Sequence, residues 1–405
     1  MTAATLERRP AAIIFILITV GLDMLALGVM LPVLPKLIVQ FEGGEIASAA
    51  SIAGFFSFSW ATMQFLFQPV LGAVSDRFGR RPVVLISNLG LGLDYLFMAL
   101  APSLPFLYVG RLISGVSAAS FSTATAYISD VTPPERRAGR FGLLGAAFGL
   151  GFIVGPMIGG LLGDYGLRAP FYGAAALSLM NFLYGYFILP ESLAAESRSK
   201  TLSWRSANIV GALQMLGGQR ELTLIAVAVF LSYLAHDSLP SLFVLYSDYR
   251  YHWDTKTTGL ALAAVGVAQT LVSGGLVRPF VARFGERASL ALALASGAVG
   301  FALYAFAPNG ALFMSGIAFI ALWGMANPSF QALATRLASA SEQGRLQGAL
   351  SSLRAVSGMI GPLLFTQIFA LSVTAGVFPG GAYFLSAVLL AASLVVARAA
   401  TARAT

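Results

Sequence analysis

The sequence contains no cysteine, two histidines and few charged residues. Without cysteine the chain cannot form a disulfide bond, and two histidines argue against a dedicated metal site. Charged residues make up 10% of the 405 residues, whereas apolar residues make up 57%. Ordinary globular proteins carry roughly 25% charged residues, and so few charges cannot cover a water-soluble surface. The composition therefore indicates an integral membrane protein.

Several functional motifs are also missing. No G-x-x-x-x-G-K-[ST] phosphate-binding loop occurs, which excludes nucleotide hydrolysis as an energy source. No histidine cluster, nucleophile motif or large extramembrane domain favours an enzyme or a receptor. The net charge of +8 comes from basic residues that cluster between apolar runs. That pattern is typical of membrane topology rather than of nucleic-acid binding.

Long apolar segments dominate the chain. A transmembrane helix needs about 20 mostly apolar residues, and the runs lack the two-residue alternation of membrane β-strands. Twelve segments qualify, near residues 11–39, 46–71, 82–102, 105–127, 141–163, 168–189, 221–247, 257–277, 288–307, 310–333, 346–371 and 377–397. The first is too long for a cleaved signal peptide. The sequence predicts an all-α membrane protein with twelve transmembrane helices.

The basic residues are distributed unevenly between the two ends of these helices. With the N-terminus inside, nineteen of the 25 Lys and Arg residues fall on the inner side, and four fall outside: Lys36, Arg168, Arg250 and Lys256. Cytoplasmic loops carry the excess of positive charge. The distribution predicts that both termini lie in the cytoplasm.

An internal repeat divides the chain into two halves. A shift of 206 residues aligns Arg77–Gly79 with Arg283–Gly285, and Gly155-Pro156 with Gly361-Pro362. We therefore expect two pseudo-symmetric six-helix bundles, 1–190 and 221–405, joined by a cytoplasmic linker, 191–220, with a surface helix around 202–216. This architecture is typical of secondary transporters, which bind substrate near the midplane between the halves. Their energy comes from an ion gradient.

Three acidic residues fall inside predicted spans: Asp23, Asp94 and Asp237. Each lies 12 to 16 residues into its helix, roughly 18–24 Å along it. A carboxylate at that depth costs on the order of 3 kcal/mol, so it should face a cavity or a partner. Because an apolar environment favours the neutral acid, these residues and the adjacent His236 are candidates for proton coupling. The alternative is that each acid only ties helices together.

Further polar residues in the spans are candidates for the substrate cavity. Arg111 stays charged, so it needs a carboxylate, a substrate or a water-filled path, and Asp23 and Asp94 are candidate partners. Polar and aromatic side chains that could line the cavity are Gln64, Asn88, Asn181, Gln269, Asn327, Gln331, Trp60, Phe58, Trp323 and Phe330. Packing is the alternative role for each of them.

A conformational gate is predicted at three places. In the loop from Gly72 to Pro82, Gly79 permits a tight turn and Asp76 can accept from arginines; its members are Gly72, Asp76, Arg77, Gly79, Arg80 and Arg81. In the fifth span, Gly155 allows close helix contact and Pro156 bends the helix. Arg354, near the inner end of its span, is expected to snorkel or to make a gate contact.

Taken together, these motifs resemble the major facilitator superfamily along essentially the whole chain. The Gly72–Pro82 loop, Arg111-x3-Gly115 and the Gly155-Pro156 motif resemble the signatures of drug/proton antiporters. Leu31–Pro35, Ser75–Val83, Leu93–Tyr95, Leu107–Arg111 and Gly344–Leu350 resemble the tetracycline-resistance efflux group more closely. That group carries a histidine in span eight and an aspartate in span nine, where this chain has Gln269 and Gly297.

The resemblance implies a proton-coupled exporter of small amphipathic drugs, tetracycline-like or multidrug, which works by alternating access. Protonation of Asp23 or Asp94 would release the drug, and Asp130 would pair with Arg80 or Arg81 in the inner latch. It also implies a monomer in the bacterial cytoplasmic membrane, with no cofactor and no nucleic-acid partner. The alternatives are proton-coupled import or export of a metabolite, and uncoupled facilitation.

Overall fold

The structure, a computed structural model, describes residues 3–118, 120–199, 219–339 and 342–401. Every regular element in this part of the chain is a helix. The chain divides into two compact units. Unit 1 comprises Met1–Phe41, Ser59–Ala207 and Thr255–Ala263, and unit 2 comprises Glu42–Phe58, Asn208–Asp254 and Ala264–Thr405.

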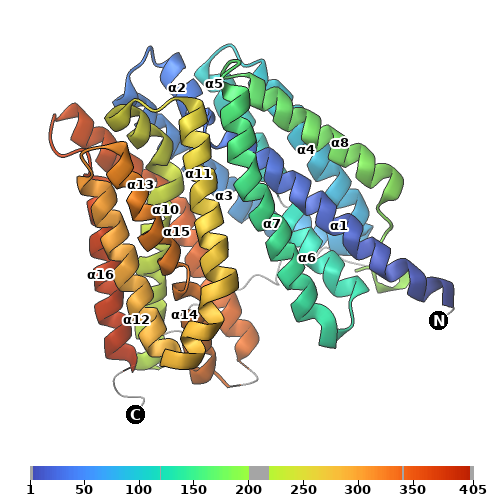
Figure 1. Cartoon of the computed structure of the whole chain (residues 1–405). Coiled ribbons are helices and arrows are strands. Elements are labelled where there is room, and N and C mark those ends of the chain that lie inside the picture. The colour runs from blue at the N-terminus through green and yellow to red at the C-terminus, as the bar shows by residue number, and fades with distance from the viewer. Residues whose placement is uncertain (1–2, 119, 200–218, 340–341, 402–405) are drawn as a thin grey trace. The chain divides into compact units, whose positions relative to one another are not determined.

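Unit 1 is a helical bundle around α1 and α4 (Figure 1). Its helices are α1 (Ala3–Met30), α2 (Leu34–Phe41), α4 (Arg80–Ala99), α5 (Leu104–Ser117), α6 (Ser120–Val131), α7 (Pro134–Gly163), α8 (Ala169–Ile188) and the short η1 (Ala195–Ser197). Most of α3 (Ile46–Phe78) also belongs here. Within the bundle α1 packs against α7 and α8, and α4 packs against α5 and α8.

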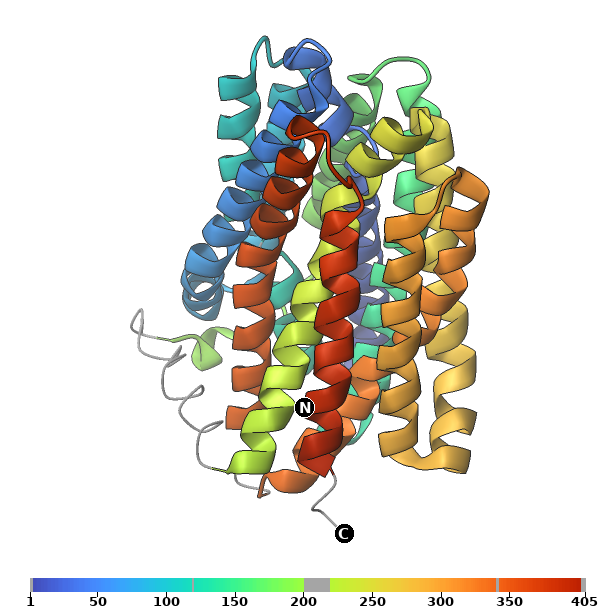
Figure 2. The same cartoon turned by 90° about the vertical axis from the view of Figure 1, so that its left-hand side faces the viewer.

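Unit 2 has the same kind of architecture. Its helices are α10 (Arg220–Tyr251), the C-terminal part of α11 (Thr255–Leu271), η3 (Val272–Leu276), α12 (Val277–Phe306), α13 (Gly310–Trp323), α14 (Ala326–Leu337), α15 (Gln343–Thr374) and α16 (Gly381–Thr401). Helix α10 packs against α15 and α16, which lie on either side of it (Figure 2), and α12 packs against α13 and α16.

Eleven helical segments in the described residues are long and apolar enough to cross a membrane. One of them, Thr255–Phe306, is 52 residues long and contains two of the twelve predicted spans. The helical path continues through the predicted loop, where the single non-helical residue is Gly285, with φ 77° and ψ 167°. A glycine adopts this positive φ without the steric penalty of a Cβ. The chain therefore makes its turn at one residue instead of in a separate loop.

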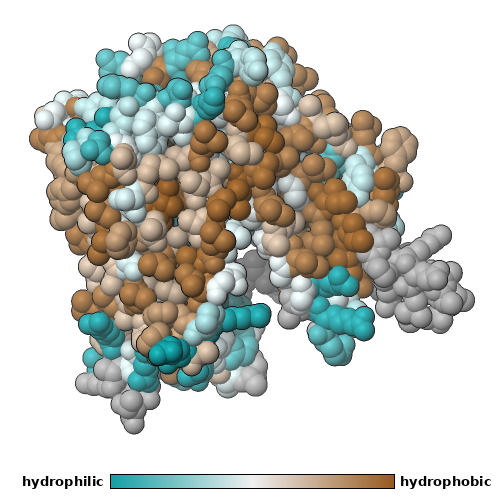
Figure 3. All heavy atoms as spheres, viewed as in Figure 1, coloured by the Kyte–Doolittle hydropathy of each residue, from teal (hydrophilic) through white to brown (hydrophobic). Residues whose placement is uncertain are grey.

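Three predicted spans are interrupted by short breaks. The first ends at Met30 and resumes as α2, the fourth divides into α5 and α6, and the tenth divides at Gly324 into α13 and α14. Apolar side chains still cover the flanks of the helices, whereas hydrophilic residues gather at their ends (Figure 3). A hydrocarbon layer about 30 Å thick requires this distribution.

Close contact between α1 and α7 depends on glycine. A Cβ on Gly155 would lie 2.6 Å from the Cα of Gly28, and one on Gly159 would lie 2.0 Å from the carbonyl oxygen of Val29. Pro156 lies inside α7 beside this contact. The glycines of the predicted packing motif in α7 therefore allow the backbones of α1 and α7 to approach closely, as in other pairs of membrane helices.

The predicted division into 1–190, 191–220 and 221–405 stays a prediction. The surface helix expected at 202–216 lies outside the described residues.

Candidate transport site

Asp23 lies on α1 in a buried network of amides. Its side chain is buried, and Asn181 on α8 donates from Nδ2 to Oδ1 of Asp23 at 2.8 Å and to the carbonyl of Thr19 at 2.9 Å. With its amide nitrogen toward Asp23, Asn88 on α4 lies 3.0 and 3.2 Å from the two carboxylate oxygens. Asn88 is completely buried. The predicted cavity residue Asn88 and the acid Asp23 therefore form one cluster that joins three helices.

Asp94 lies on α4 in a different environment. It is 2% exposed, and neither carboxylate oxygen has a hydrogen-bond partner among the described residues. Helix α5 approaches closely at Gly110, where a Cβ would lie 3.1 Å from Oδ1 of Asp94. The next residue, Arg111, is buried and close enough to act electrostatically on Asp94. Its guanidinium lies 5.1 Å from the ring centroid of Trp60. Unit 1 therefore holds a buried carboxyl group, Asp94, and a buried guanidinium, Arg111, that lie near each other without a direct ion pair.

Unit 2 contains a charged cluster between α10 and α15. Asp237 is buried, and its Oδ1 accepts from Nη1 of Arg354 at 3.1 Å. Nη2 of Arg354 lies 3.4 Å from Nδ1 of His236, which is 3.7 Å from Oδ1 of Asp237. The neighbouring residues His236 and Asp237 thus share one arginine from a distant part of the chain. Gly361 makes room for the acid, because a Cβ there would lie 2.5 Å from that of Asp237.

Other polar and aromatic side chains predicted for the cavity have contacts of their own. Arg354 lies 5.2 Å from the ring of Tyr233, whose hydroxyl donates to Asn327 at 3.1 Å. Gln347 donates to Gln331 at 2.9 Å. Of the other predicted cavity residues, Gln269 lies next to Gly324, and Trp323 donates to Ser232 at 3.2 Å. Phe330 is buried. On α3, Phe58 and Gln64 are half-buried. None of these positions alone assigns a role.

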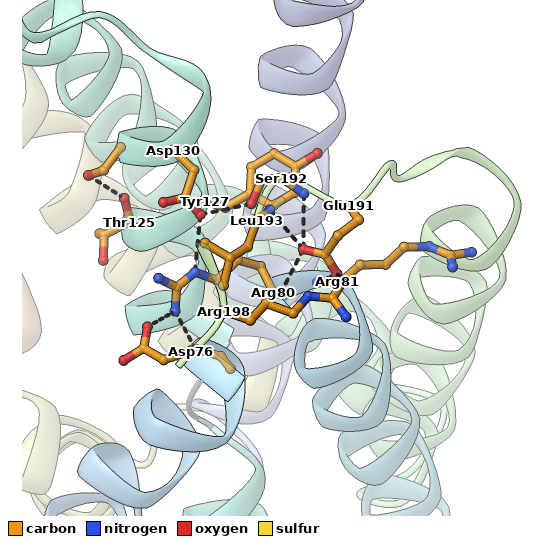
Figure 4. Close-up of polar contacts among 12 residues, drawn as sticks. Asp76, Arg80, Arg81, Thr125, Tyr127, Asp130, Glu191, Ser192, Leu193 and Arg198 are labelled. Carbon is orange, nitrogen blue, oxygen red and sulfur yellow. Dashed lines mark hydrogen bonds and ion pairs between the residues drawn. The ribbon is translucent and has the colours of Figure 1, made fainter. Parts of the chain in front are cut away.

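Three of the predicted gate residues, Asp76, Arg80 and Asp130, meet at the start of α4 (Figure 4). Gly79 forms the turn before α4 with φ 106°, a conformation that favours glycine because it has no Cβ. Arg80 pairs with Asp76 at 2.5 Å and with Asp130 at 3.1 Å, and it donates to Ser75 at 2.6 Å. The expected contact between Asp130 and Arg80 is present, and its role as a latch stays a prediction. The guanidinium of Arg77 lies 5.3 Å from the ring centroid of Phe78, and Gly72 has open space beside its Cα.

Sequence reasoning missed Glu191, which lies at the centre of this network (Figure 4). Its Oε1 accepts from the backbone amides of Arg80 at 2.8 Å, Ser192 at 3.0 Å and Leu193 at 3.1 Å, and Oε2 accepts from the amide of Arg81 at 3.3 Å. A carboxylate is favourable at a helix N-terminus, where free amides point outward. The sequence did contain a signal for this contact, an acidic residue directly after the sixth predicted span. We interpreted that residue as part of the cytoplasmic linker.

Among the described residues, no three His, Cys, Asp or Glu side chains come together in a group that could hold a metal ion. The site chemistry is instead that of buried carboxylates, arginines and amides, which suits proton transfer and ion pairing within a membrane.

The family follows from comparison of the whole sequence. Residues 13–362 match the Major Facilitator Superfamily. The chain belongs to this superfamily. It is 38% identical to the class C tetracycline resistance protein of Escherichia coli, over 97% of this chain and 98% of that protein. It is 37% identical to the class G tetracycline resistance protein of Vibrio anguillarum over 96% and 98%. Multidrug resistance protein 2 of Bacillus subtilis (strain 168) is 26% identical over 91% of each.

Solved structures show the same fold. A crystal structure of the nucleoside transporter NupG matches with a TM-score of 0.75 and 16% identity, over 96% of this chain and 98% of that one. The human organic anion transporter MFSD10 (TETRAN) matches with a TM-score of 0.69 and 21% identity, over 96% and 99%. The chain is a multi-pass membrane transporter of the major facilitator fold, as the motifs predict, and not an enzyme.

Proposed function

We propose that this protein exports small amphipathic drugs in exchange for protons. The observation that carries the drug class is the similarity to tetracycline resistance proteins along nearly the whole chain. Alternating access, driven by the proton gradient without a bound cofactor, would move the drug outward. We further propose that the protein acts as a monomer in the bacterial cytoplasmic membrane, with both termini inside.

Proton transfer is assigned to unit 1. Asp94 supports this assignment because it is buried and its carboxylate accepts no hydrogen bond from any described residue, so only the more distant Arg111 offsets its charge. Asp23 has amide donors, which can hydrogen-bond a carboxylate or a carboxylic acid. In the proposed cycle, a proton from outside neutralises one of these acids and the drug leaves. Loss of the proton to the cytoplasm restores affinity for the next drug molecule.

The second half lacks the histidine and aspartate typical of tetracycline pumps in spans eight and nine, where Gln269 and Gly297 stand. We propose that His236 and Asp237, both candidates for proton coupling, could substitute for that pair. Asp237 already has Arg354 as a counterion, which is why we place coupling first on Asp23 and Asp94.

Proton flux in liposomes tests the proposal. The purified protein is reconstituted with a pH-sensitive dye inside, a proton gradient is imposed, and a drug panel that includes tetracycline is added. We expect at least one drug to trigger proton flux in the wild type, and Asp94→Asn and Asp23→Asn to abolish it. Asp164→Asn, an exposed acid at the end of α7, is the matched control and should retain wild-type flux.

Each other outcome contradicts a defined part of the proposal. Drug movement without proton flux would indicate an uncoupled facilitator. Accumulation of a metabolite in place of drug export would indicate an importer. Flux that survives in both acid variants would exclude unit 1 as the site of coupling.

A further inference from the structure

We infer that Arg354 of unit 2 binds an ionised acidic group of the transported compound. This inference deepens the proposed function and rests on it, because it names a chemical class of cargo, an aromatic amphipathic anion. It starts from the asymmetry of the Arg354–Asp237 pair. The arginine side chain is 42% exposed, whereas the aspartate side chain is 5% exposed. A ligand therefore meets the cation first.

The guanidinium of Arg354 has N–H groups that remain available to a ligand. Guanidinium offers five N–H groups in a planar fork that fits a carboxylate. In the described part of the chain, Nη1 donates to Asp237, Nη2 faces His236, and no hydrogen bond engages Nε. Its contact with Asp237 goes through Oδ1 alone, and Oδ2 is buried without a partner. A single contact is weaker than a bidentate pair, so an incoming anion can share the arginine or draw it away.

The groups next to the guanidinium suit an aromatic ligand. The ring of Tyr233 lies 5.2 Å from the arginine, and the half-exposed His236 ring lies 5.6 Å from that of Trp323. Asn327, held by the Tyr233 hydroxyl, is exposed beside them. A cation flanked by rings and an amide favours a planar compound with one acidic group. Such polar side chains do not face lipid chains within a span, so we place this face of unit 2 toward water.

Asp237 and His236 have a positioning role in this arrangement. Among the described residues, the titratable groups in polar contact with Arg354 are one acid, Asp237, and one ring, His236. Asp237 fixes the guanidinium and also competes with any anion for it. Removing the acid should strengthen anion binding, whereas a site built on Asp237 for a cationic drug would respond in the opposite way.

Binding of a matched pair of probes tests the inference without a proton gradient. The full-length protein in detergent is titrated calorimetrically with 2-naphthoate and with neutral 2-naphthamide. We expect wild type to prefer naphthoate, Arg354→Gln to weaken naphthoate binding by about tenfold or more, and naphthamide binding to be unchanged. Asp237→Asn should bind naphthoate more tightly than wild type. Arg278→Gln, which removes an exposed arginine from α12, is the control and should bind like wild type.

Arg354→Gln leaves the buried Asp237 without its counterion and lowers the stability of the protein, so a second variant accompanies it. The double variant Arg354→Gln/Asp237→Asn removes both charges and should fold while losing the preference for naphthoate. Equal binding of the two probes to wild type, including no binding of either, overturns the inference. So does a double variant that binds naphthoate like wild type, because the pair would then only tie α10 to α15. These results leave the flux test of proton coupling intact.

Discussion

At the scale of single residues, Glu191 is the side chain with the largest number of backbone partners in the described network. It accepts from four backbone amides, two of them at the start of α4. We expect Glu191→Gln to lower the free energy of unfolding by about 1–2 kcal/mol, since hydrogen bonds to charged groups contribute about 1.5–3 kcal/mol and partial exposure reduces this. The Tm of the purified protein measures it.

Glu196→Gln is the matched control for this residue. Glu196 lies five residues further on in η1, is exposed and should leave the Tm unchanged. An equal loss in both variants would mean that the charge of the segment, and not the amide contacts, stabilises the start of α4.

Most pairings at this scale could not be predicted from one sequence. Asp237 and Arg354 are 117 residues apart, and Asn181 and Asp23 are 158 apart. A single sequence shows which side chains are expensive to bury, so all three membrane acids were found. It does not show which helix faces meet, so the partners of Asp23 and Asp237 were not predicted.

At the scale of helices, the contact between α1 and α7 sets a sharp size limit. A Cβ on Gly155 would collide with the backbone of Gly28, whereas Gly149 on the same helix has open space. We expect Gly155→Ala to destabilise the protein by about 1–3 kcal/mol through overpacking. Gly149→Ala should be neutral or stabilise the helix by up to about 1 kcal/mol. The Tm in detergent distinguishes the two, and equal values would exclude close packing at Gly155.

The number and position of the helices were largely predictable, whereas their ends were not. Long apolar runs indicate membrane-spanning helices directly, because a helix satisfies all of its backbone hydrogen bonds within the segment. The two spans on either side of Gly285 were predicted, but the polar residues around it read as a loop, whereas the chain stays helical on both sides and turns at this one glycine. The breaks near residue 118 and at Gly324 lie inside apolar runs, where hydropathy carries no signal.

At the scale of the whole molecule, the distribution of positive charge predicts the orientation in the membrane. The cysteine-free chain allows a direct check, since any single introduced cysteine is the sole reactive thiol. In intact cells we expect a membrane-impermeant maleimide to label Glu45→Cys, in the segment before α3, and to label Glu196→Cys only after permeabilisation. Both positions are exposed. The reverse labelling would show that the termini lie outside.

The contacts of Glu191 also decide where this chain could be divided into two genes. The segment from Glu191 to Ser199 is held within unit 1 by its own contacts. Arg198 forms an ion pair with Glu191 at 3.9 Å, and the amide of Ser199 donates to the carbonyl of Asp76 at 2.9 Å. A first fragment that ends after Ser199 would keep every one of these bonds within itself. A fragment that ends at Pro190 would leave the amides at the start of α4 without their carboxylate. Co-expressed fragments are therefore expected to restore transport from the first division and to fail from the second.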